Sequence, residues 1–245
     1  MKKSKHTIKK YFKFDQREIR DLLITVIVIG FIFSYNEWGE ETFDLIVGLR
    51  NLFNSIIIVG LAFLVHEASH KFLAIGKGYD ARYRMWFPGL MVGLLITVLS
   101  NGNLFFLAPG FVLINAIPLH RVGHYKPFLT YKDNAIISYV GPLSNIILAL
   151  IFKVIGAFPL INETLVVKAM IINAWLAVFN ILPIPPLDGS KVFFGSRIFY
   201  FFGAGFIIAS AILMFVTTLM TTIIVSLLLA LVTAIIGYMT LERGK

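Results

Sequence analysis

The amino-acid sequence predicts an all-α polytopic membrane protein with about six transmembrane helices and one re-entrant or strand-containing membrane segment. Of its 245 residues, 58% are hydrophobic and only 14% are charged, and the mean hydropathy is +0.84. A soluble domain carries about 25% charged residues. The apolar residues gather in long runs, and in a bilayer such runs satisfy their backbone polar groups by forming helices.

Cysteine is absent, which excludes disulfides and thiolate metal sites, so any metal must be bound by His, Asp or Glu. The formal charge of +9 raises the question of a nucleic-acid partner. Lys and Arg flank the apolar runs, however, and this arrangement orients proteins in membranes. We therefore expect the lipid bilayer as a partner and no nucleic acid.

The first expected elements are a basic cytosolic tail over residues 1–21 and a unit over 22–44, made of a first span and an acidic outer loop. The span, Leu22–Tyr35, is followed by no small-residue cleavage site, so we interpret it as a retained signal anchor. A second apolar run, Leu45–Ile75, contains the pattern His66-Glu67-Ala68-Ser69-His70 near its expected cytosolic end.

The next segment, Met85–Leu119, is apolar but is broken at Ser100–Asn103 and at Pro109-Gly110. If it enters the membrane and returns as a re-entrant hairpin, the basic loop over residues 121–132 stays on the cytosolic side, as the distribution of positive charge favours. A single complete crossing is the alternative, and it would place part of that loop outside.

Two further spans are expected at Ala135–Phe158 and Leu165–Leu182. The tail Ile198–Met239 is too long for one span, since a helix of about 42 residues would reach about 63 Å. A turn within Thr217–Thr222 would divide it. This gives a membrane core over 45–190, a two-span hairpin over 191–245, and both termini in the cytosol.

His66 and His70 are four residues apart, so a helix presents both imidazoles on one face. Glu67 follows at about 100° of helical rotation, where it can approach a metal-bound water without binding the metal. This is the arrangement of the His-Glu-x-x-His motif in zinc proteases. The motif predicts a Zn²⁺ site with Glu67 as the general base.

A catalytic zinc site has three protein ligands and keeps the fourth position for water. Asp188 ends the fourth expected span at the same cytosolic level as His70, so it is the expected third ligand. His120 and His124 are rivals, but Pro118, Gly123 and Pro127 argue against a regular helix around them.

Three motifs in order resemble those of the site-2 protease family of intramembrane zinc metalloproteases, in its compact form without a PDZ insert. They are His66–His70, Gly141-Pro142-Leu143-Ser144-Asn145, and Asn180 through Pro183 to Leu187-Asp188-Gly189. The chain departs from the family's usual glycines at Ser69 and Ser190, and both replacements are small.

The resemblance implies a three-helix catalytic core within 45–190 and an endopeptidase that hydrolyses transmembrane proteins or peptides within or near the bilayer. It also implies His66, His70 and Asp188 as zinc ligands, Glu67 as catalytic base and Asn180 as a catalytic group that helps to stabilise the oxyanion. The cell membrane is the expected location.

Several alternatives stay open at this stage. Gly141-Pro142 can serve packing alone, since Pro is tolerated in a first helical turn. A protease class that processes prenylated proteins would use a downstream Glu as third ligand, but the candidates Glu163 and Glu242 lack a suitable setting. A metal transporter, or an inactive membrane scaffold with a zinc site, is the alternative from another functional class. The sequence does not determine the substrate or the oligomeric state.

Overall fold

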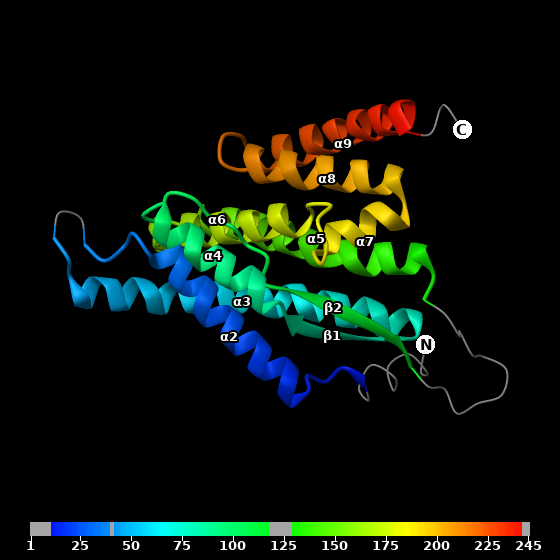
Figure 1. The fold of residues 1–245 in the computed structure, drawn as a ribbon. Helices are drawn as coiled ribbons and strands as arrows, with labels where there is room; N and C mark the ends of the chain where they lie inside the picture. Colours follow the sequence, from blue (N-terminus) through cyan, green and yellow to red (C-terminus); the bar gives the residue numbers. More distant parts are fainter. Residues whose placement is uncertain (1–10, 40–41, 118–128, 242–245) are drawn as a thin grey trace.

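The computed structural model describes residues 11–39, 42–117 and 129–241, and it is mostly helical with one small sheet (Figure 1). Helices α8 and α9 form one layer, α5 and α6 lie in the middle, and α2, α3 and the strands complete the molecule on the other side. In chain order the elements are α2 (Gln16–Ser34), α3 (Leu45–Lys77), β1 (Tyr79–Met85), α4 (Phe87–Leu99), β2 (Gly110–Ala116), α5 (Tyr131–Ile155), α6 (Glu163–Asn180), α7 (Asp188–Gly195), α8 (Arg197–Leu213) and α9 (Leu219–Leu241).

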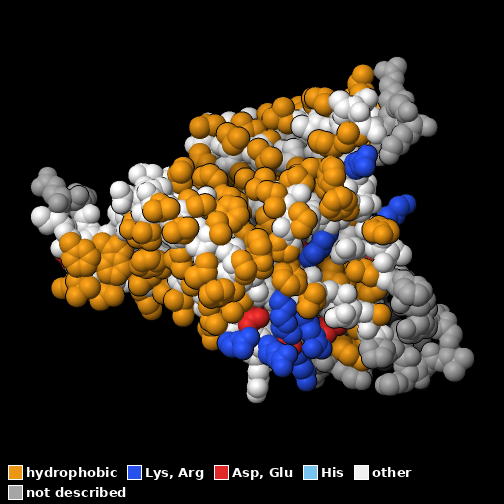
Figure 2. Space-filling view, in the orientation of Figure 1, with side chains coloured by type: hydrophobic (Ala, Val, Ile, Leu, Met, Phe, Trp, Pro, Cys, Tyr) orange, Lys and Arg blue, Asp and Glu red, His pale blue; other side chains and the backbone are white. Residues whose placement is uncertain are grey.

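This is a membrane protein. Four helices of the described chain are long and apolar enough to cross a bilayer, namely α3, α5, α6 and α9. The expected number was about six, but α4 and α8 are shorter, and α2 carries four charged residues near its start. Hydrophobic side chains cover much of the visible surface, while Lys and Arg gather at one edge, near the start of α2 and β1 (Figure 2). That both termini face the cytosol stays a prediction.

The segment after α3 doubles back on itself. Strands β1 and β2 pair antiparallel, from Tyr79 opposite Ala116 to Met85 opposite Gly110, and α4 connects them in the sequence. The turn after α4 uses left-handed backbone at Asn101 (φ 49°) and Gly102 (φ 72°). Within the described residues the chain therefore returns as in the expected hairpin and not as in a single crossing; its entry into the membrane stays a prediction. Residues 118 and 119 lie outside the described chain.

Several helix boundaries differ by a few residues from the expected ones; α5, for example, begins at Tyr131 rather than at Ala135. Helix α2 begins at Gln16 rather than at Leu22, because Asp15 and Glu18 form a capping box that starts the helix before the apolar run. The expected turn at Thr217–Thr222 lies slightly earlier, and α9 already begins at Leu219. Helix α3 begins at Leu45 as expected and ends at Lys77, two residues after the expected Ile75; the cap residue Gly78 follows, with a φ of 89° that favours glycine.

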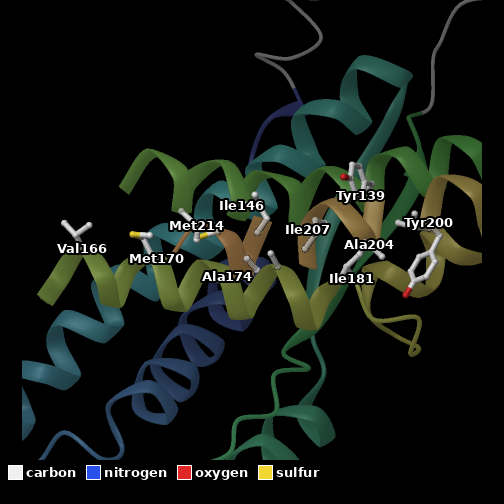
Figure 3. Close-up of a cluster of buried hydrophobic side chains, with 14 residues drawn as sticks. Tyr139, Ile146, Val166, Met170, Ala174, Ile181, Tyr200, Ala204, Ile207 and Met214 are labelled. Carbon is white, nitrogen blue, oxygen red and sulfur yellow. The ribbon is translucent and has the colours of Figure 1, made fainter. Parts of the chain in front are cut away.

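The largest apolar core lies between α5, α6 and α8 (Figure 3). Ile146 of α5 and Ile207 of α8 are fully buried there, with Ala174 of α6 packed nearby. Gly203 of α8 brings that helix onto the Tyr139 ring, as small residues do where membrane helices approach closely. This packing holds α5 in place, and the opposite side of α5 meets α3 at the His66–His70 motif.

Candidate metal centre

The structure brings His66, His70 and Asp188 together. Asp188 Oδ2 lies 3.3 Å from His66 Nε2 and 3.0 Å from His70 Nε2, and the two Nε2 atoms are 3.1 Å apart. All three residues are buried. Both histidines come from α3 and share one face because they are four residues apart, whereas Asp188 is the first residue of α7.

This donor set fits zinc. Two imidazole nitrogens and one carboxylate oxygen are ligands that zinc prefers, and three protein ligands leave one position open for chemistry. The backbone of α5 supports the same conclusion, because a Cβ atom at Gly141 would lie 2.2 Å from His70 Nε2 and 2.6 Å from His66 Nε2. Glycine therefore leaves space beside the nitrogens that would face the ion.

A chain of buried amides orients His66. Asn173 Nδ2 donates to Ala169 O at 2.8 Å, which turns Asn173 Oδ1 towards Asn145. Asn145 Nδ2 donates to that oxygen at 3.2 Å, so Asn145 Oδ1 accepts from His66 Nδ1 at 2.7 Å. With the proton on Nδ1, the Nε2 lone pair of His66 points to the centre, as a metal ligand requires.

His70 is oriented by the backbone of α5. Its Nδ1 donates to Ile137 O at 2.6 Å, which leaves His70 Nε2 unprotonated towards the centre. Pro142 lies inside α5, so the interpretation that Gly141-Pro142 occupies a first helical turn is wrong. Since Pro142 has no N–H and its ring crowds the carbonyl of Ser138, it loosens the helix at the turn that offers Ile137 O to His70.

Asp188 is held by the start of α7. Gly189 packs so closely on the end of α6 that a Cβ there would lie 2.0 Å from Ile181 O, so only glycine fits. Ser190 Oγ donates back to Leu187 O at 2.7 Å. The second carboxylate oxygen, Asp188 Oδ1, accepts from Lys191 Nζ at 3.3 Å, and this leaves Oδ2 for the histidines.

The two expected catalytic groups, Glu67 and Asn180, differ in their hydrogen bonds. Glu67 is buried next to His66, and within the described chain no hydrogen bond engages its carboxylate. Asn180, the last residue of α6, is also buried, but its Nδ2 donates to Leu176 O at 2.9 Å. One N–H of that amide stays available, so the oxyanion role of Asn180 stays a prediction.

Of the rival ligands, Glu163 begins α6 and is not part of the cluster, while His120, His124 and Glu242 lie outside the described residues. Sequence reasoning did not find the orienting roles of Asn145 and Asn173. Both are polar residues within apolar runs, a signal that marks functional positions in membranes.

Two curated proteins are similar to this chain. "Putative zinc metalloprotease MJ0611" of Methanocaldococcus jannaschii is 37% identical over 184 residues, which cover 74% of this chain and 85% of the relative. The chain belongs to this zinc metalloprotease family. "Putative zinc metalloprotease YwhC" of Bacillus subtilis is 28% identical over 149 residues, covering 56% of this chain and 66% of that relative. No family model and no solved structure matches the chain.

Zinc is thus the cofactor of this metalloprotease, in agreement with the chemistry of the buried cluster. Two of the cluster's three residues lie on α3, a helix long and apolar enough to cross a membrane, and this leads to the proposal that follows.

Proposed function

We propose that this zinc metalloprotease is an intramembrane endopeptidase that hydrolyses transmembrane proteins or peptides within or near the bilayer, as its resemblance to the site-2 protease family implies. The observation that carries the proposal is the position of the cluster. His66, His70 and Glu67 are buried in α3, a helix long and apolar enough to span a membrane. Charged groups at such positions are costly and are retained for function.

In this proposal His66, His70 and Asp188 bind the zinc ion, whose chemistry when bound is to acidify water and to polarise a peptide carbonyl. Glu67 then takes a proton from the attacking water and returns it to the leaving amine. Its position one residue after His66, without a hydrogen-bond partner in the described chain, leaves the carboxylate available for both transfers.

A substrate helix must unwind before its peptide bonds are accessible, because helical carbonyls and amides are already paired. An extended peptide can pair with the edge of a sheet. One edge of the β1–β2 sheet is occupied: Tyr83 N donates to Glu18 Oε1 at 3.1 Å, and Met85 N donates to Asp21 Oδ2 at 3.4 Å. The outer edge of β2 is therefore where we propose that substrate pairs.

The test uses the purified protein in liposomes with a peptide reporter that spans the membrane. Glu67→Gln should retain stoichiometric zinc and lose cleavage, because the amide cannot accept the proton. Glu163→Gln is the matched control, since Glu163 is exposed at the start of α6, and it should cleave like wild type. Cleavage by Glu67→Gln would contradict the base assignment. Zinc flux into liposomes without cleavage would favour a transporter instead.

A further inference from the structure

Lys191 connects the metal cluster to the sheet. It lies one turn after Asp188 on α7, and its Nζ donates to Asp188 Oδ1 at 3.3 Å. The same Nζ donates to Val112 O of β2 at 2.9 Å. The Lys191 side chain is only 19% exposed, so both contacts are largely shielded from water. One side chain thus bridges a candidate metal ligand and the strand proposed to bind substrate.

The Val112 carbonyl belongs to the outer edge of β2. In an antiparallel pair, residues alternate between those bonded to the partner strand and those that point away from it. Val112 lies opposite Tyr83, whose N–H points to Glu18 and not to β2. Val112 O therefore points away from β1, towards α7, on the edge where an added peptide strand would bond.

The bridge also fixes the orientation of the Asp188 carboxylate. Oδ2 faces both imidazoles, while Oδ1 is engaged by Lys191. A carbonyl oxygen has two lone pairs, so Val112 O can accept from Lys191 and still accept an N–H from a bound peptide. Lys191 can therefore stay in place while substrate pairs with β2.

We propose that Lys191 is a positioning residue that fixes the outer edge of β2 relative to Asp188 and so determines which peptide bond of a bound substrate meets the metal centre. This inference rests on the proposed function, in which the substrate backbone pairs with that edge. A purely electrostatic role, in which Lys191 only compensates the charge of Asp188, makes a different prediction: loss of Lys191 would weaken zinc binding without moving the cleavage site.

The first experiment measures position without any catalysis. The chain has no cysteine, so Leu113→Cys on β2 and Phe194→Cys on α7, both at exposed positions, can be spin-labelled specifically. Double electron–electron resonance on this doubly labelled protein should give a narrow distribution of distances between the two labels. Lys191→Met, which keeps the length of the side chain but has no donor, should broaden or shift that distribution.

Lys153→Met is the matched control for this measurement. Lys153 also donates from a partly buried side chain to backbone carbonyls, those of Met214 and Thr217, but it lies away from the metal cluster. This variant should keep the narrow distance distribution. If Lys191→Met also keeps it, the positioning role is wrong, whatever the activity of the protein.

The second experiment identifies the cleaved bond in the membrane-spanning reporter by mass spectrometry. Wild type and Lys153→Met should cut one bond. Lys191→Met should retain zinc but cut additional bonds about two residues away, because a two-residue shift of the bound substrate strand keeps the same side chains on the same face. Its kcat should fall by up to about 100-fold, the cost of a misplacement of about 1 Å. KM should change little.

Lys191→Arg keeps a charged donor and should restore cleavage at the wild-type bond. Unchanged cleavage sites and kcat in Lys191→Met would overturn the proposal, and so would loss of zinc with the cleavage site retained. If wild type cleaves no reporter, the proposed function fails, and the spin-label distances still decide whether Lys191 positions β2.

Discussion

Gly141 offers the sharpest test of the geometry around the two histidines. Gly141→Ala would place a Cβ 2.2 Å from His70 Nε2 and 2.6 Å from His66 Nε2, whereas ordinary contact begins near 3.4 Å. One or both imidazoles would have to move by about 1 Å, but metal sites tolerate changes of only about 0.2 Å in their ligand distances. Hydrogen bonds to Asn145 and Ile137 O hold both rings and oppose such a movement.

Loss of a residue that orients a metal ligand lowers metal affinity by about 10–100-fold. We expect Gly141→Ala, which displaces the ligands themselves, to lower zinc affinity by no less than this. This corresponds to about 1.4–2.7 kcal/mol of binding free energy. The assay is competition for zinc between the purified protein and a chelator of known affinity. Zinc-dependent protection against thermal unfolding should fall in parallel, because a ligand stabilises the folded state according to its affinity.

Gly76→Ala is the control for the change from glycine to alanine in a helix. Gly76 lies in the last turn of α3, and a Cβ there would contact nothing within 4 Å. This variant should bind zinc like wild type and gain about 0.5–1 kcal/mol of stability from the better helix former. Equal zinc affinity in Gly141→Ala and Gly76→Ala would refute the reasoning about the space beside the imidazoles.

Three further outcomes are expected. Asn145→Ala should weaken zinc binding about 10–100-fold in the same competition assay, because His66 loses the acceptor that fixes its proton on Nδ1. Asn145→Asp keeps an acceptor and should bind zinc more tightly than Asn145→Ala. Glu18→Gln should lower the free energy of unfolding by about 3–5 kcal/mol, measured by denaturant titration in detergent, because it leaves Lys71 charged and buried without its counter-ion; an unchanged value would contradict this. The pKa of Asp15 is lowered, mainly by the backbone N–H of Glu18 and then by Arg84, so its contribution to stability is present above about pH 4 and is lost as the pH falls through the depressed value. The difference in melting temperature between wild type and Asp15→Asn should therefore shrink below that pH.

Local sequence patterns were sufficient for the part of the site that lies on one helix. His66 and His70 share a face because of their spacing, and no distant residue is needed to see it. Asp188 required one more step, a ligand count together with its place at the end of an apolar run. The hairpin after α3 was also predictable, because Asn101-Gly102 favours a turn and the positive charges favour a return to the same side.

Contacts between distant residues were not predictable in the same way. Hydropathy placed the start of α2 after its charged residues, yet Glu18 lies inside the protein and pairs with Lys71, 53 positions away. The acceptor of His66, Asn145, lies 79 positions away and depends on how α5 packs against α3. Similarly, the bridge from Lys191 to Val112 exists only once β2 is paired with β1.

The measurement that tests the central claim most directly is the zinc content per chain of wild type, Asp188→Ala and Asp80→Ala, purified in parallel without added metal. Asp80 lies on β1 and pairs with Arg82, so it controls for the loss of a carboxylate away from the cluster. We predict one zinc ion in wild type and in Asp80→Ala, and loss of that ion in Asp188→Ala. Stoichiometric zinc in Asp188→Ala, held as tightly as in wild type, would contradict the assignment of His66, His70 and Asp188 as the metal centre.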